Sequence, residues 1–147
     1  MKAFFKPDPL IFYSTVNSKK YPVNTIQSVE SAFKEGADVI CLNIALSGDG
    51  VVMCVSDSDI GKFCEKSGKV SDYTLAEIKE LDAGYSFKDS KGEYSFKGKK
   101  SRFFTLEEVF QAFPDKRFNI TIMEKSKRIV ESYASLVIKN NFTDRVL

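Results

Sequence analysis

Histidine is absent from this chain of 147 residues, and this absence restricts the possible chemistry more than any other feature of the composition. Histidine is the usual general acid or base near neutral pH and the commonest metal ligand in proteins. Without it, the chain can form neither a Ser-His-Asp triad nor a Cys-His pair. Catalysis by carboxylates or by lysine stays open. Tryptophan is absent too, but 13 phenylalanines and six tyrosines supply enough apolar surface for one core.

Cysteine, net charge and long apolar runs are also scarce. Three cysteines are an odd number, which argues against a disulfide framework and favours the reducing cytoplasm. The formal net charge is only +2, so we expect no nucleic-acid partner. No apolar run approaches the ~20 residues that cross a bilayer, and the first residues lack an apolar stretch of secretory length. We therefore expect a cytoplasmic protein without an integral membrane segment.

The apolar pattern of the first residues predicts a strand followed by a helix. Residues 10–13 form a short apolar run, which is typical of a strand. Asn24 or Thr25 can cap a helix whose apolar residues follow at helical spacing. Gly36 ends that helix, as a glycine just past the last turn often does.

Two apolar runs follow in close succession. Residues 37–46 are almost continuously apolar, which is typical of a strand buried on both faces in a parallel α/β sheet. A turn cluster at 47–50 separates them from a second apolar run at 51–55. No helix fits between the two runs. A hairpin and a pair of barrel strands with an irregular crossover both remain compatible with this pattern.

Two capping boxes predict short helices further along. Thr74 and Glu77 form the first Thr-x-x-Glu box, and Thr105 and Glu108 form the second, whose helix ends before Pro114. In these positions the glutamates need no catalytic role.

The end of the chain predicts a strand, a helix and the start of another strand. The strand covers 118–123, the helix covers 126–140, and the segment 144–147 begins the last strand. The residues of the helix that we expect to face inward are Ile129, Val130, Tyr133, Leu136 and Val137. With no internal repeat or linker, residues 1–147 are interpreted as a single domain.

Several blocks of this sequence resemble the N-terminal part of the glycerophosphodiester phosphodiesterase family. The blocks occur in the family's order and cover nearly the whole chain. They are Asn-Thr at 24–25, S-V-E-S-A-F-K-E-G-A-D at 28–38, D-G-V-V at 49–52, T-L-A-E-I-K-E-L-D-A-G at 74–84, T-L-E-E-V at 105–109, P-D-K at 114–116 and D-R-V-L at 144–147. The resemblance implies a TIM-type β/α barrel.

The same resemblance shows that the family's functional positions hold other residues here. The positions are the His-Arg-Gly after the first strand, a Glu-Asn-Thr, a metal-binding Glu-x-Asp, a His-Asp and a Glu-x-Lys on the fourth strand. In that order, the matching residues are Tyr13-Ser14-Thr15, Val23-Asn24-Thr25, Cys41-Leu42-Asn43, Ser56-Asp57 and Thr121-Ile122-Met123. Only Asn24, Thr25 and Asp57 match the family.

These replacements remove the chemistry that the resemblance would otherwise imply. In the family, carboxylates hold a divalent cation such as Ca²⁺ or Mg²⁺, and histidines supply acid and base. Cys41 is instead a soft ligand, Asn43 is neutral, and Asp57 alone cannot replace three carboxylates. We therefore expect no catalytic residue, no metal and no cofactor in this chain.

Individual residues also have simpler structural interpretations. Cys41 and Cys54 lie in the two apolar runs and are expected to be inert buried thiols, whereas Cys64 lies in a polar segment and is expected to be exposed. Tyr13 is expected to fill the cavity left by the lost catalytic groups rather than to stack on a ligand. Asp57 and Asp59 fit a loop turn better than a weak cation site.

The segment 88–102 carries six basic residues interleaved with Tyr94 and Phe96. Such a pattern can bind nucleic acid or an anionic lipid surface. Because acidic residues elsewhere nearly cancel its charge, we favour a solvated insertion loop.

Together these features predict an α/β fold: a partial, half TIM-type barrel with an insertion at about 57–104. A full barrel takes roughly 250 residues, so strands five to eight are not expected within 147. Tyr13, Cys41, Asn43, Ser56 and Thr121 should converge at one end of the sheet as a neutral patch.

Three functions fit these expectations. The favoured one is a catalytically degenerate family member, a pseudoenzyme that acts by binding or assembly. The second is a divergent phosphoric diester hydrolase of lipid or glycerophosphodiester metabolism, completed by another chain. The third is a scaffold partner of a complete family member. The expected partners are a second copy of the chain, as a homodimer, and a small phosphodiester or anionic ligand.

Overall fold

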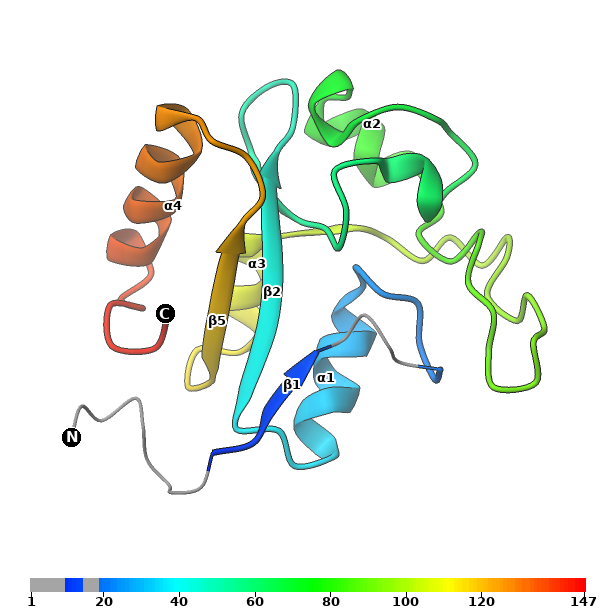
Figure 1. The fold of residues 1–147 in the computed structure, drawn as a ribbon, viewed down its shortest axis with the longest axis horizontal. Coiled ribbons are helices and arrows are strands. Elements are labelled where there is room, and N and C mark those ends of the chain that lie inside the picture. The colour runs from blue at the N-terminus through cyan, green and yellow to red at the C-terminus, as the bar shows by residue number, and fades with distance from the viewer. Residues whose placement is uncertain (1–9, 15–18) are drawn as a thin grey trace.

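The computed structural model describes residues 10–14 and 19–147, and in this part of the chain five strands form one sheet (Figure 1). The strands are β1 (Phe12–Ser14), β2 (Val39–Leu46), β3 (Val52–Cys54), β4 (Phe104–Thr105) and β5 (Arg117–Ile122). Thr15, matched above to the family's first motif, lies outside the described residues.

Strand β2 is the centre of the sheet. It pairs in parallel with β1 on one edge and with β5 on the other. Its last residues pair antiparallel with β3, and β3 pairs antiparallel with β4. The two apolar runs at 37–46 and 51–55 therefore form a hairpin, which resolves the choice that the sequence left open. The two-residue strand β4 was not predicted.

Four α-helices accompany these strands in the described part of the chain. They are α1 (Ile26–Lys34), α2 (Leu75–Glu80), α3 (Leu106–Ala112) and α4 (Lys127–Lys139), with short 3₁₀ helices at η3 (Ile60–Lys62) and η4 (Val70–Asp72). Thr25 caps α1, and both predicted capping boxes are confirmed at the starts of α2 and α3. No helix among the described residues is long and apolar enough to cross a membrane.

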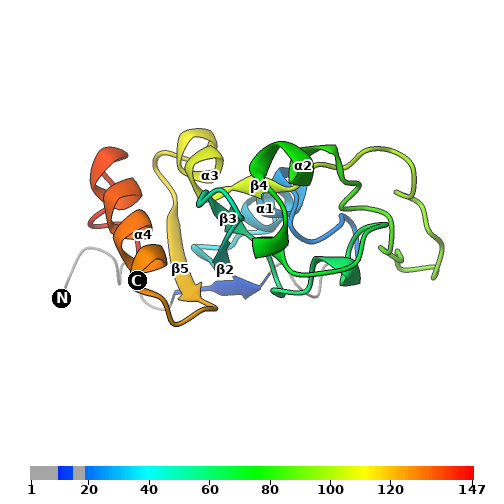
Figure 2. The same ribbon diagram turned by 90° about the horizontal axis from the view of Figure 1, so that it is seen from above.

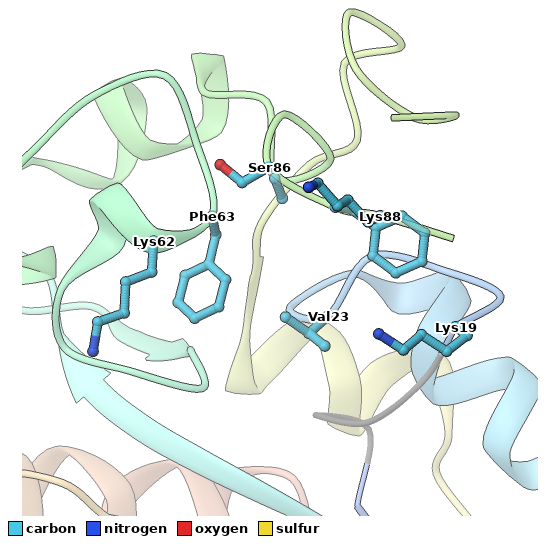
Figure 3. Close-up of a pocket in the computed structure, with 8 residues that line it drawn as sticks. Lys19, Val23, Lys62, Phe63, Ser86 and Lys88 are labelled. Atoms are coloured by element: carbon cyan, nitrogen blue, oxygen red, sulfur yellow. The ribbon is translucent and has the colours of Figure 1, made fainter. Parts of the chain in front are cut away.

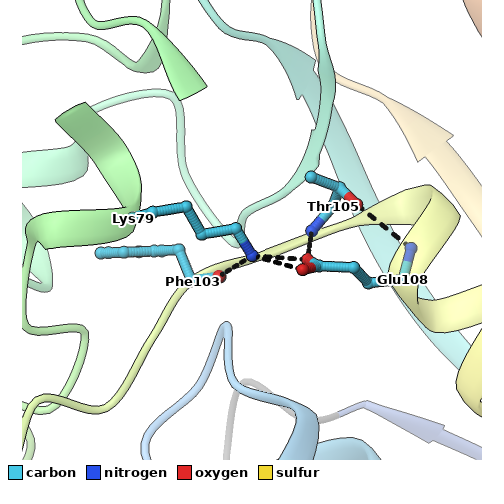
Figure 4. Close-up of polar contacts among 4 residues, drawn as sticks. All are labelled: Lys79, Phe103, Thr105 and Glu108. Carbon is cyan, nitrogen blue, oxygen red and sulfur yellow. Dashed lines mark hydrogen bonds and ion pairs between the residues drawn. The ribbon is translucent and has the colours of Figure 1, made fainter. Parts of the chain in front are cut away.

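The capping box of α3 also ties this helix to α2 (Figure 4). Thr105 accepts a hydrogen bond from the Glu108 amide, and the Glu108 carboxylate accepts one from the Thr105 amide. Lys79 of α2 donates to the same carboxylate at 2.7 Å and to the carbonyl of Phe103 at 2.9 Å. Burial raises the pKa of Glu108, but Lys79 and the Thr105 amide outweigh it, and the pKa lies below its ordinary value. Glu108 is therefore ionised and links α2 to α3 through its ion pair with Lys79.

The main core lies between the sheet and helices α1, α3 and α4, which cover one face of β2 and β5 (Figure 2). Alternate residues of β2 supply the sheet side of this core: Ile40, Leu42, Ile44 and Leu46. Phe110 of α3 stacks on Phe142 with ring centroids 3.9 Å apart. The inward face predicted for α4 is correct except at Val130, which is 52% exposed. Helix α4 therefore buries a narrower stripe than its apolar residues suggested.

A second core forms under the segment that was predicted to be a solvated insertion. Ile60, Val70 and Ile78 are fully buried there against Met53 of β3. Cys64 belongs to this cluster with 4% exposure, so the prediction that it is exposed is wrong. The apolar residues of 57–83 are separated by polar ones in the sequence, so no local pattern indicates that they form a core; they come together only in the folded chain. Most residues of the loop between 84 and 102 are exposed or partly exposed, and they add nothing to this core before Phe103.

That loop is anchored by the buried carboxylate of Asp82. One oxygen accepts hydrogen bonds from the amides of Gly84 and Ser101, both at 3.0 Å, and the other accepts one from Gly98 at 2.7 Å. Asp82 is only 7% exposed. Several lysines of the loop lie over its own aromatic rings, as Lys97 does over Tyr85 at 4.4 Å. The basic and aromatic residues of the segment thus pack on one another.

The C-terminal residues continue the sheet beyond β5. Phe118 donates from its amide to the Arg145 carbonyl, and Val146 forms a parallel bridge with Phe118. The prediction that a further strand begins at 144–147 is therefore confirmed. On the face of the sheet that turns away from α1, α3 and α4, Ala45 of β2 packs in the second core with residues of α2, η3 and η4.

Removing the Asp82 carboxylate should loosen the loop and destabilise the fold. Because three backbone amides would lose a charge-assisted acceptor, Asp82→Ala should lower the free energy of unfolding by about 3 kcal/mol in urea denaturation. Hydrogen exchange at Gly98 and Ser101 should accelerate. Asp115→Ala is the control, since that side chain is 91% exposed, and should change stability by less than about 0.5 kcal/mol. Equal losses in the two variants would contradict the anchoring role of Asp82.

Candidate functional site

A small cavity of about 90 Å³ collects half of the ten positions that the sequence singled out. It lies where β1 ends, beside the middle of β2 and the end of β3. The singled-out residues that line it are Ser14, Asn24, Cys41, Asn43 and Ser56. We call it the neutral cavity, because none of the described residues that line it is acidic or basic.

Strand geometry explains how the neutral cavity is assembled. Cys41 and Asn43 lie two residues apart on β2, so they project from the same face, opposite to the core residues between them. Ser14 pairs with Cys41 across the β1–β2 ladder. Thr121 of β5 pairs with Asn43 and therefore lies on the same face, although it does not line the cavity.

Asn24 is the most constrained residue of the neutral cavity. Its φ is +63°, a left-handed conformation that asparagine tolerates better than most residues. Its side-chain oxygen accepts hydrogen bonds from the Ser56 amide at 2.7 Å and the Ser56 hydroxyl at 2.8 Å. Its side-chain nitrogen is buried without a hydrogen-bond partner. This nitrogen is therefore an enclosed N–H donor without a partner at the edge of the cavity.

The other polar groups of this face are weakly bonded. The Asn43 side-chain nitrogen donates to the Ser56 carbonyl at 3.4 Å. The Asn119 side-chain nitrogen contacts the Cys41 sulfur at 3.7 Å. Asn119 of β5 was not predicted, although the alternation along 118–123 could have placed it beside Thr121 on the same face. The face as a whole offers amides, hydroxyls and a thiol.

Tyr13 does not converge with these residues, and the prediction that it fills the cavity is wrong. It pairs with Ile40, a core residue, and so projects to the helix side of the sheet. Its hydroxyl donates to the Glu35 carboxylate at 3.1 Å. Burial and then this contact raise the pKa of Tyr13. Neighbouring strand residues point to opposite faces, so Ser14 rather than Tyr13 reaches the cavity.

The remaining singled-out residues are placed elsewhere. Asp57 pairs with Lys62 and accepts a hydrogen bond from the Asp59 amide at 2.9 Å, so the predicted loop turn is confirmed. Met123 packs against the second core. Val23, next to Asn24, lines a different and larger cavity.

The donor set gives no support to a metal site. No group of three or more Cys, Asp or Glu residues in the described chain could hold a metal ion. Cys54 borders the neutral cavity with 2% exposure, and burial raises the pKa of its thiol, which keeps it protonated. Cys41 is only partly buried, less than predicted.

The larger cavity, about 290 Å³, lies between the segment before α1 and the stretch from Lys62 to Lys88 (Figure 3). Three lysines line it, which are Lys19, Lys62 and Lys88. We call it the lysine cavity. Sequence reasoning noted only Lys88, because the other two are far away in the chain.

Comparison with known sequences identifies relatives of one kind. Residues 17–146 match the model of the "Glycerophosphoryl diester phosphodiesterase family". A "Glycerophosphodiester phosphodiesterase" from Caldanaerobacter subterraneus subsp. tengcongensis is 37% identical over 136 residues, which are 89% of this chain and 53% of that protein. One from Bacillus subtilis is 36% identical over 124 residues, 82% of this chain and 41% of that protein. The chain thus spans about half the length of these relatives or less.

Solved structures give the same picture of the fold. The glycerophosphoryl diester phosphodiesterase domain of Rv2277c from Mycobacterium tuberculosis superposes with a TM-score of 0.85 at 23% identity, covering 95% of this chain and 52% of that one. A glycerophosphodiester phosphodiesterase from Agrobacterium tumefaciens superposes with a TM-score of 0.79 at 23% identity, covering 93% and 55%. The predicted α/β fold, part of a TIM-type barrel, is confirmed.

Replacing Asn24 should lower the free energy of unfolding more than replacing Asn141, another asparagine in the left-handed backbone conformation. Asn24→Ala forces alanine into φ +63° and leaves the partly buried Ser56 amide without its acceptor, so we expect a loss of about 2–4 kcal/mol of unfolding free energy. The matched control is Asn141→Ala, at φ +57° on the surface, which should lose only about 1 kcal/mol. Thermal and urea unfolding of both variants would test this. Similar losses would show that the bonds to Ser56 contribute little.

Proposed function

The chain belongs to the glycerophosphoryl diester phosphodiesterase family, and from this premise we propose that it is a catalytically degenerate member that acts by binding or assembly. The observation that carries this proposal is the neutral cavity. Cys41 and Asn43, which the resemblance matches to the family's metal-binding carboxylates, line it together with no charged side chain among the described residues. A phosphodiester bound there would meet neither a metal nor a general acid or base.

The residues present do not fit the divalent cation that the family's chemistry implies. Hard cations prefer several carboxylate oxygens, whereas this cavity supplies amides, hydroxyls and thiols. The unpaired nitrogen of Asn24 is a donor and would repel a cation. We therefore derive no catalytic step for this chain through a metal.

At about 90 Å³ the neutral cavity has room for one acceptor-rich group of a small phosphodiester or other anionic ligand, and not for the whole molecule. The Ser14 hydroxyl, which lines the cavity, can donate to an oxygen of that group. Binding there would be weak, because neutral hydrogen bonds contribute only about 0.5–1.5 kcal/mol each. We also infer a cytoplasmic location, which the three free thiols support.

A first test measures turnover and metal binding together. We expect no hydrolysis of glycerophosphocholine above buffer with Ca²⁺ or Mg²⁺, and no micromolar metal binding by calorimetry, because the cavity lacks carboxylates. The Bacillus subtilis relative serves as the positive control for the assay. Cys41→Glu with Asn43→Asp is the matched variant and should gain metal affinity. Turnover or micromolar binding by the unaltered chain would favour a divergent hydrolase instead.

Assembly is the second part of the proposed function, and the occupant that we propose is a second copy of the chain. β1, β2, β5 and the segment 144–147 lie side by side in parallel, which makes four of the eight strands of a closed barrel. Within the described residues, no strand pairs with the outer edge of β1. Exposed edges attract further strands, and two copies would supply eight. A complete family member could accept the same edges, as a scaffold interaction.

The self-association can be measured directly. Light scattering at micromolar concentration should report about twice 16.6 kDa. Phe12 of β1 is 46% exposed and projects from the same face of the sheet as Ser14, so Phe12→Glu should shift the equilibrium to monomer. Ile138→Glu, at a 70% exposed position on α4, is the control and should leave the dimer intact. A monomer that is stable without either change would refute this part of the proposal.

A further inference from the structure

The lysine cavity combines positive charge with an apolar wall. Beyond the three lysines, it is lined by Val23, Phe63, Ala83, Ser86 and Phe87, and none of these described residues is acidic. Figure 3 shows the amine ends of Lys19 and Lys88 turned toward the middle of this group, whereas the amine of Lys62 points away from it. The Phe63 ring and the Val23 side chain lie between the lysines.

The three lysines differ in how their charge is compensated. Lys62 forms an ion pair with Asp57, which explains its outward direction. Lys88 lies over the Tyr94 ring with its amine 5.0 Å from the centroid, a contact that leaves its positive charge unneutralised. Lys19 forms no ion pair with any described residue. Two uncompensated charges therefore face a hollow with apolar walls, where the field of a charge is focused and less screened.

We propose that this cavity binds an organic phosphate, with the phosphate between Lys19 and Lys88 and a small apolar group against Phe63. Lysine amines bind phosphate as point charges, and an aromatic wall favours a ligand with an apolar part. The volume of about 290 Å³ lies near the lower end of small-molecule sites and suits a compact ligand. This binding requires no metal.

The site is distinct from the neutral cavity of the proposed function, although the two are neighbours. Val23 lines the lysine cavity, and the next residue, Asn24, lines the neutral one. The lysine cavity includes one position that the resemblance matches to a functional residue, Val23, but none of the three lysines occupies such a position. The lysine cavity therefore adds an anion site to a chain whose older site is uncharged.

Titration with phenyl phosphate, followed by calorimetry and by amide chemical shifts, tests the proposal. We expect saturable submillimolar binding in the presence of EDTA, weakened by added salt, with the largest shifts at Phe63 and Lys88. Inorganic phosphate should bind about tenfold more weakly, because it cannot use the apolar wall. Equal affinity for the two probes would overturn the role assigned to Phe63, and shifts centred on Asn43 and Ser56 would overturn the location.

Matched charge variants complete the test. Lys19→Ala with Lys88→Ala should weaken phenyl phosphate binding about tenfold or more, because both uncompensated charges are removed. Lys91→Ala with Lys125→Ala removes the same charge from exposed positions outside the cavity and should change affinity less than about twofold. All four side chains are exposed or lie in loops, and circular dichroism would verify folding. Equal weakening in the two double variants, or none in the first, would overturn the proposal.

Discussion

The rest of the structure depends on the hydrogen bonding of β2 along both of its edges. The same residues of this strand, from Val39 to Cys41, pair with β1 on one side and with β5 on the other. Because β2 is fixed from both sides, its alternation decides what each face does. Ile40 and Leu42 project from one face and pack in the core with helices α1, α3 and α4. Cys41 and Asn43 project from the other face and border the neutral cavity. A shift of one residue would exchange the core for the cavity lining.

Two consecutive residues line cavities that differ in charge. Val23 lines the lysine cavity, and Asn24 lines the neutral cavity. The neutral cavity is held by bonds from Asn24 to Ser56, which join the start of α1 to the end of β3. The lysine cavity opens toward the segment that follows Ser56. The charge of each cavity is thus set by the few residues that line it. Strand residues, among them Ser14, Cys41 and Asn43, line the neutral cavity, whereas every residue that lines the lysine cavity lies outside the strands.

Local signals predicted much of the fold, and distant contacts account for most of what was missed. The boxes at Thr74 and Thr105 predicted α2 and α3, because a cap needs only residues three apart. Cys64 was assigned to the surface since its neighbours in sequence are polar, yet its neighbours in space are not. Tyr13 was placed in the site by alignment alone, whereas strand alternation turns it to the other face. The site residues on β2 were predicted correctly as neighbours in space, but the lysine cavity joins segments that no local pattern connects.

The way in which Asp82 holds the loop between residues 84 and 102 has a consequence for evolution. Its carboxylate binds backbone amides, which every residue except proline carries, so the anchor places no demand on most side chains of the loop. Gly84 and Gly98 are exceptions, because a Cβ on Gly84 would lie 2.8 Å from that of Phe96 and Gly98 has a φ of +78°. Most side chains of this loop can therefore change during evolution while its backbone conformation is retained. Substitutions in such a loop can change the residues at the edge of a ligand site, as at Phe87 and Lys88, without changing the barrel strands.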